Sequence, residues 1–139
     1  MATTRVANAQ WNGTLFEGSG EVSFASSDLG TFPVTWAARS AEPNGVTSPE
    51  ELIAAAHATC FSMALSHALA QAGTPPTELN TSAEVDFTPG TGITAIRLTV
   101  SGDVPGLDAE GFAAAAAAAK EGCPVSQALS AVPITLVVE

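Results

Sequence analysis

Residues 48–71 read SPEELIAAAHATCFSMALSHALAQ, and this stretch contains the strongest helix signal in the chain. Ser48 is a favoured N-cap, Pro49 suits the first helical position, and Glu51 completes a capping box with Ser48. Gly73, followed by two prolines, is typical of a helix end. Because the residues between these ends are apolar or small on every side, we expect a buried central helix.

Strand signals lie on both sides of this helix. Asn12-Gly13 favours a tight β-hairpin, and Phe32, Val34 and Trp36 alternate with other residues as in a strand. The expected strands are Val6–Trp11, Thr14–Glu17, Glu21–Ala25, Phe32–Ala38, Thr81–Phe87, Ile93–Val100 and Pro133–Glu139, with an exposed connection over Ser40–Thr47. The pattern predicts an α+β fold with antiparallel sheets around the central helix, in a single domain over residues 1–139.

Two further helices are expected in the C-terminal third. Asp108 can cap a helix through Lys120, and the alanine run inside it allows close packing against a neighbour. Gly122 ends that helix, and Cys123-Pro124 begins a short third helix that runs to Leu129.

The charge balance is strongly acidic, with 4 Lys and Arg against 14 Asp and Glu and a formal net charge of −10. Phosphate backbones and anionic membranes repel such a surface, so we expect neither nucleic acid nor membrane as a partner. The first residues show no charged segment followed by an apolar run, and no apolar run reaches about 18 residues. The expectation is a soluble cytoplasmic protein.

The chain has 2 cysteines, which are too few for a disulfide scaffold and stay reduced in cytosol at rest. Cys60 lies inside the apolar helix, where a lone cysteine is most often a small buried hydrophobe. Cys123 precedes Pro124 and so caps a helix, where the positive end of the backbone dipole favours a thiolate. The second cysteine raises the prospect of redox chemistry.

His57 stands three residues before Cys60, on a neighbouring part of the helix surface. It could act as a base for the Cys60 sulfur or simply pack in the core. No Cys-x-x-Cys or His-x-x-x-His pair is present, so we expect no metal and no cofactor. Two alternatives stay open: a cysteine-dependent hydrolase or acyl-transfer enzyme using Cys60 and His57, and a binding or structural module with two inert thiols.

Two motifs in this chain resemble those of a known family. SPEELIAAAHATCFSMAL, residues 48–65, resembles the OsmC signature around its reactive cysteine, and GCPVS, residues 122–126, resembles the second-cysteine motif of that family. With the Trp11-Asn12-Gly13 hairpin and the final strand, the resemblance covers essentially the whole chain. His57 replaces a Gly-aromatic type of sequence, which favours the OsmC branch over the Ohr branch.

The resemblance implies an OsmC-like fold in an intertwined homodimer with two active sites at its interface. It also implies a peroxiredoxin-like peroxidase that reduces organic hydroperoxides in stress defence and is recycled by an external dithiol reductant. By position, Cys60 would be the peroxidatic cysteine, Cys123 the resolving cysteine that forms a disulfide with it, and Arg39 and Glu50 the polar pair that activates Cys60. The apolar neighbours expected to suit such a substrate are Leu52, Phe61 and Met63.

The position of Glu50 raises a question about which subunit it serves. On one continuous helix, ten residues separate Glu50 from Cys60 by about 15 Å, which no side chain spans. We therefore expect Glu50 to reach Cys60 of the other subunit, while Cys60 and Cys123 come within disulfide reach in one subunit.

Overall fold

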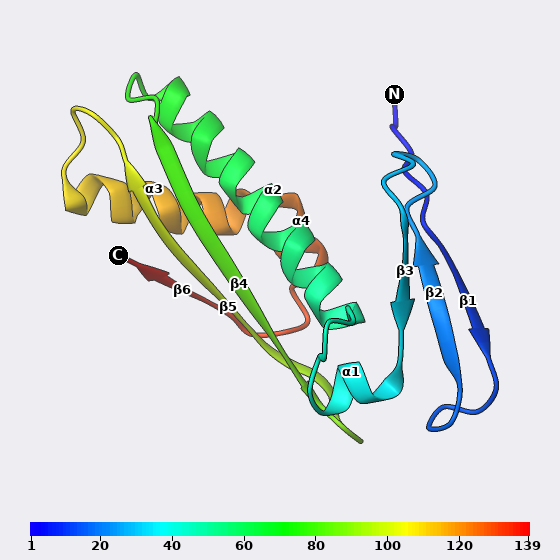
Figure 1. Ribbon diagram of the computed structural model, residues 1–139. Helices are drawn as coiled ribbons and strands as arrows, with labels where there is room; N and C mark the ends of the chain where they lie inside the picture. Colours follow the sequence, from blue (N-terminus) through cyan, green and yellow to red (C-terminus); the bar gives the residue numbers. More distant parts are fainter. The chain divides into compact units, whose positions relative to one another are not determined.

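The computed structural model describes residues 1–139, and the chain forms two compact units, Met1–Pro49 and Glu50–Glu139. Figure 1 shows that each unit has a sheet of its own. The boundary between the units lies at the start of the long helix, and the single OsmC-like domain expected over residues 1–139 stays a prediction.

The N-terminal unit opens with the predicted hairpin, but its loop is longer than expected. The strands β1 (Asn8–Asn12), β2 (Ser19–Ser23) and β3 (Thr31–Val34) form an antiparallel sheet in that order. Asn12 pairs with Ser19, so residues 13–18 form the connection and the strand expected over Thr14–Glu17 is absent. The Gly18 N–H donates to the Thr14 carbonyl over 2.9 Å, which closes these residues into a turn.

The strand expected over Phe32–Ala38 ends early. After β3, the chain enters α1 (Trp36–Ser40), and the Thr35 hydroxyl accepts a hydrogen bond of 3.1 Å from the Ala38 N–H. This N-cap stabilises a helical turn where the alternation of residues suggests a strand. Arg39 therefore lies in the last turn of a short helix and not at the end of a strand, as the sequence analysis has it.

The C-terminal unit contains β4 (Glu78–Thr88), β5 (Gly92–Asp103) and β6 (Ile134–Val138), in that order. β4 and β5 form the predicted hairpin, and their register pairs Glu78 with Asp103. β5 and β6 are parallel, so the expectation of antiparallel sheets is wrong for this pair. The reason is the long crossover between them, which contains α3 (Ala109–Gly122) and α4 (Pro124–Ala128), both close to prediction.

One core holds this unit together. The long helix α2 (Pro49–Gln71) is continuous, as predicted, and packs with α3 against the same face of the sheet. The shared core cluster consists of Phe61, Leu65, Leu69, Leu98, Val100, Phe112, Ala116, Ala119 and Cys123. The N-cap of α3 is Asp108, whose carboxylate accepts from the Gly111 N–H over 2.8 Å.

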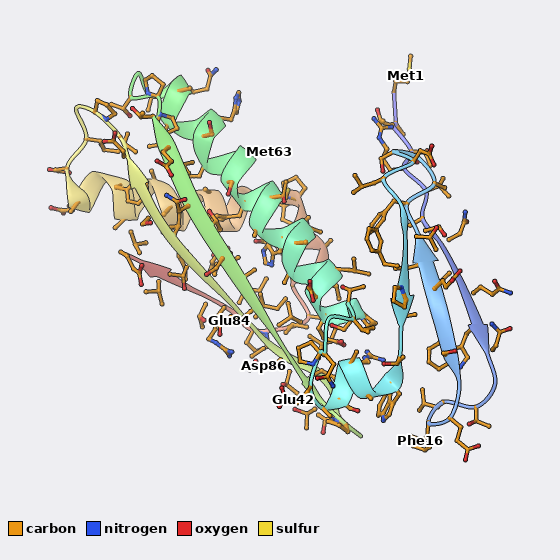
Figure 2. All side chains as sticks on the ribbon, viewed as in Figure 1. Met1, Phe16, Glu42, Met63, Glu84 and Asp86 are labelled. Atoms are coloured by element: carbon orange, nitrogen blue, oxygen red, sulfur yellow. The ribbon has the colours of Figure 1, made fainter.

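Only one face of α2 is buried within a single chain. His57, Phe61, Leu65 and Leu69 lie on that face, while Met63, labelled in Figure 2, is 67% exposed. By length and composition α2 could cross a membrane, a test that the core helix of a soluble protein also passes. The sequence predicts a helix that is buried on all sides, but within a single chain α2 is buried along one side only.

The other face of the C-terminal sheet carries the main ion pairs. Arg97 of β5 donates to both carboxylate oxygens of Asp86 at 2.7 and 2.8 Å, and contacts Glu84 at 3.3 Å. Figure 2 labels both acidic residues. The Arg97 hydrogen bonds lower the pKa of Asp86. These side chains are half-exposed, so the pairs contribute little to stability.

Candidate active site

The fold brings the two cysteines together from distant parts of the chain. Cys60 lies in α2, and Cys123 lies between α3 and α4, where it is the N-cap residue of α4. Both are free thiols, and Cys60 packs against the cluster that contains Cys123. Each thiol shifts the pKa of the other, so the two side chains are near neighbours. This arrangement supports the expectation that they come within disulfide reach in one chain.

The two sulfurs differ in their access to solvent. Cys123 is 0% exposed, whereas Cys60 is half-buried. A small molecule arriving from solvent can therefore reach Cys60 more readily than Cys123.

The two thiols also differ in their electrostatic surroundings. Burial raises the pKa of Cys60, and the N–H of Val125 offsets this only in part. Burial acts in the same direction on Cys123, but polar contacts with the Ser126 N–H, the Cys60 thiol and the Ser126 hydroxyl outweigh it and lower the pKa of Cys123. The contact with the Ser126 N–H does not reach the geometry of a helix-capping hydrogen bond. The opposite directions mean that Cys123 loses its proton more readily than Cys60 within this unit.

His57 is connected to the cysteine pair through a hydrogen bond that the sequence does not predict. Its Nε2 lies 2.7 Å from the Ser126 hydroxyl, and both side chains are buried. Ser126 in turn contacts the Cys123 sulfur. His57 is thus linked to Cys123 through Ser126, and its observed hydrogen bond is not with Cys60. The hydrolase alternative, in which His57 is the base for Cys60, loses its geometric support.

Ser126 is the site residue that the sequence analysis missed. It belongs to the GCPVS motif, two residues after Pro124, but a serine in the first turn of a helix is common for reasons of local hydrogen bonding. Its partner His57 is 69 residues away in sequence, so no local pattern could reveal the contact.

The other residues expected at the site differ in their burial and in the unit to which they belong. Glu50 is buried in the first turn of α2, and the helix between it and Cys60 is unbroken. Phe61 is fully buried in the core, so its side chain offers no surface to a ligand. Leu52 is half-buried and Met63 is exposed, so both retain accessible apolar surface. Arg39 belongs to the N-terminal unit, whereas the cysteines belong to the other.

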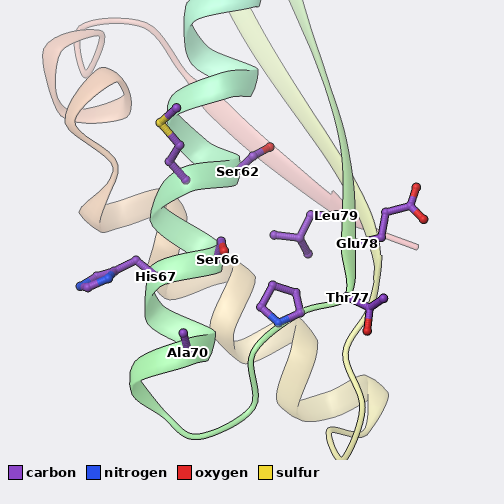
Figure 3. Close-up of a pocket in the computed structure, with 9 residues that line it drawn as sticks. Ser62, Ser66, His67, Ala70, Thr77, Glu78 and Leu79 are labelled. Atoms are coloured by element: carbon purple, nitrogen blue, oxygen red, sulfur yellow. The ribbon is translucent and has the colours of Figure 1, made fainter.

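A hollow in the C-terminal unit lies elsewhere on α2. Figure 3 shows a groove of about 630 Å³ between the second half of α2 and the start of β4, with Ser66 and Leu79 on its walls. Neither cysteine lines it. No group of three or more His, Cys, Asp or Glu side chains in the chain is arranged to hold a metal ion.

Comparison with known proteins gives a consistent picture. A family model described as OsmC-like protein matches residues 42–137. The chain is 44% identical over 134 residues to "Peroxiredoxin OsmC" of Escherichia coli K12, covering 94% of this chain and 93% of that protein. The same protein name and identity occur in Shigella flexneri.

Solved structures agree at the level of the fold. An organic hydroperoxide resistance protein OsmC from Legionella pneumophila is similar with a TM-score of 0.71 and 25% identity, covering 99% of both chains. The organic hydroperoxide resistance protein OhrB of Bacillus subtilis is similar with a TM-score of 0.70 and 24% identity, covering 96% of this chain and 98% of that chain.

Proposed function

Because this chain belongs to the OsmC family, we propose that it is a thiol-dependent peroxidase that reduces organic hydroperoxides to alcohols through Cys60 and Cys123. The observation that carries the proposal is the proximity of the two cysteines, of which only Cys60 retains exposed surface. The relationship to proteins named peroxiredoxin supports the peroxidase activity, and the organic hydroperoxide resistance proteins support the class of substrate.

The reaction has two chemical steps. In the first, the Cys60 thiolate attacks one oxygen of the hydroperoxide; a sulfur–oxygen bond forms, the oxygen–oxygen bond breaks, and the alkoxide leaves and takes a proton to become the alcohol. In the second, Cys123 attacks the sulfur of the Cys60 sulfenic acid, and the oxygen leaves as water. One hydroperoxide and two thiols thus give one alcohol, one water and one disulfide. An external dithiol then restores both thiols by exchange.

The first step needs a Cys60 thiolate, and the surroundings within the C-terminal unit do not supply one. Burial raises the pKa of Cys60, and the Cys123 sulfur raises it further. A cation near Cys60 would reverse this effect and would also stabilise the departing alkoxide. We assign this role to Arg39, with Glu50 as the carboxylate that holds it. The unbroken α2 keeps Glu50 far from Cys60 of its own chain, so Glu50 would act on the partner subunit.

A homodimer also accounts for the apolar surface of the single chain. Phe16, Leu29 and Met63 are 75%, 73% and 67% exposed, which is high for large apolar side chains. We propose that a second copy covers such surface and that the substrate lies against Leu52 and Met63. The acidic chain would work as a soluble cytoplasmic protein in oxidative or osmotic stress defence.

Mixing the reduced protein with one equivalent of cumene hydroperoxide tests the function. Mass spectrometry should show the loss of two hydrogens and of both free thiols, with cumyl alcohol as product. Cys60→Ser should abolish the reaction, and Cys123→Ser should permit about one turnover before over-oxidation. Two intact thiols after exposure to cumene hydroperoxide would refute the proposal. Continued turnover of cumene hydroperoxide by Cys123→Ser without over-oxidation would show that Cys123 is not the resolving cysteine.

A further inference from the structure

Two buried polar side chains, His57 and Ser126, adjoin the cysteine pair. The Cys60 and Cys123 sulfurs interact, the Ser126 hydroxyl contacts the Cys123 sulfur, and His57 Nε2 lies 2.7 Å from that hydroxyl. His57, Cys123 and Ser126 are 0%, 0% and 6% exposed. The step proposed above as peroxide reduction uses neither Ser126 nor His57, so these buried polar groups need another explanation.

The direction of the hydrogen bonds follows from the number of protons available. A serine hydroxyl has a single proton, and a Ser126 hydroxyl that hydrogen-bonds to a Cys123 thiolate must donate that proton, because a thiolate only accepts. The Ser126 oxygen can then only accept from His57, which places the ring proton on Nε2. His57 Nδ1 is buried without a hydrogen-bond partner, which suits a bare lone pair better than an N–H group. Burial lowers the pKa of His57, so the ring is neutral in this arrangement.

We propose that Ser126 and His57 serve the resolving step: Ser126 donates its hydroxyl proton to the Cys123 sulfur, and His57 is a positioning residue that directs this hydroxyl by donating to it from Nε2. This inference rests on the proposed peroxidase function. In the resolving step the Cys123 thiolate attacks the Cys60 sulfur, a sulfur–sulfur bond forms, the sulfur–oxygen bond breaks, and hydroxide leaves and takes a proton to become water. The Ser126 hydroxyl increases the share of Cys123 that is ionised for this attack.

The location of the pair explains why it acts on the second step. Ser126 follows the buried Cys123 by three residues, and His57 hydrogen-bonds to Ser126 and not to Cys60. Cys60 of α2 is the titratable group that acts on Cys123, and His57 of α2 is hydrogen-bonded to Ser126. Lys120 and Glu121 from the end of α3 line a hollow together with Ser126. Lys120 is engaged with the Ile134 carbonyl and with Glu121.

Rapid-quench experiments on the full chain separate the two steps. Hydroperoxide loss reports the first step, and trapping of the Cys60 sulfenic acid by dimedone, read by mass spectrometry, reports its lifetime before disulfide closure. Ser126→Ala should lengthen that lifetime by about tenfold, the order expected for a lost hydrogen bond to a charged group. The first step should change by less. The pH profile of closure should shift to higher pH, which a merely structural substitution would not cause.

Matched variants keep the result interpretable if Ser126→Ala folds poorly. Ser126→Thr keeps the hydroxyl and should restore fast closure. His57→Gln keeps a donor near the position of Nε2 and should close faster than His57→Leu, which has none. Ser62→Ala is the control, because it removes a 2.8 Å hydrogen bond between the same helix and Thr81 without touching either sulfur.

The outcomes separate this inference from the proposed function. If the native protein forms no disulfide with cumene hydroperoxide, the peroxidase proposal fails first. If the native protein forms the disulfide but Ser126→Ala and His57→Leu close it at the native rate and pH, the peroxidase proposal stands and the role of Ser126 and His57 is refuted. Slow closure in Ser62→Ala to the same extent would equally overturn the assignment.

Discussion

Oxidation of the cysteine pair should stabilise the protein against unfolding. The Cys60 and Cys123 positions differ by 63 (123 less 60), so the disulfide closes a loop of that length. In the chain-entropy treatment, cross-linking a loop of this length stabilises the folded state by about 4 kcal/mol, because the unfolded chain loses conformations. The two thiols are near neighbours in the reduced chain, because each shifts the pKa of the other, so the folded state should need little rearrangement and retain most of this gain.

Differential scanning calorimetry of the reduced and oxidised proteins measures the effect. For a chain of this size, the expected gain corresponds to a rise in Tm on the order of 10 °C after treatment with one equivalent of cumene hydroperoxide. Cys123→Ser, treated in the same way, should show no comparable rise, since it cannot close the loop.

An oxidised protein with both thiols consumed and an unchanged or lower Tm would refute the reasoning. It would mean that the disulfide forms only in a distorted or partly unfolded chain, in spite of the proximity of the two thiols. A covalent dimer on a non-reducing gel would place the bond between chains and remove the loop from the argument altogether.

Three further predictions concern α2. Leu65→Ala, at a fully buried position, should lower the free energy of unfolding by about 3 kcal/mol in urea titrations, and Met63→Ala by much less; equal losses would mean that both faces of α2 are tightly packed. Mixed chains carrying Cys60→Ser and Glu50→Gln should regain peroxidase activity that neither variant has alone, because one shared site is intact; activity at the level of the unmixed variants would place Glu50 in its own chain's site or outside the mechanism. Burial lowers the pKa of His57 in the folded state, so the unfolded chain binds its proton more readily and stability should fall as the pH drops below about 6.5; His57→Gln should flatten this dependence in urea titrations at successive pH values, and an unchanged slope would contradict it.

Local signals predicted the helices of the C-terminal unit accurately. The Pro49 start and the Gly73 stop bound α2, and Asp108 caps α3 as expected. These features are readable because a cap, a proline or a glycine acts on backbone groups only a few residues away. Local signals gave wrong predictions for residues 14–17 and for Arg39, which were expected to be in or after a strand. Residues 14–17 lie in a turn closed by a backbone hydrogen bond, and the Thr35 cap places Arg39 in a helix.

The sequence by itself determined the family, the two cysteines and the boundaries of the helix that carries Cys60. Only the tertiary structure decided which face of α2 is buried, because a helix that is apolar all round has no directional pattern to read. It also decided that His57 serves Ser126 and Cys123 across 69 residues, and that the Cys123 sulfur is the better stabilised thiolate within this unit. Those properties depend on groups that packing brings together from distant segments, so no spacing along the chain encodes them.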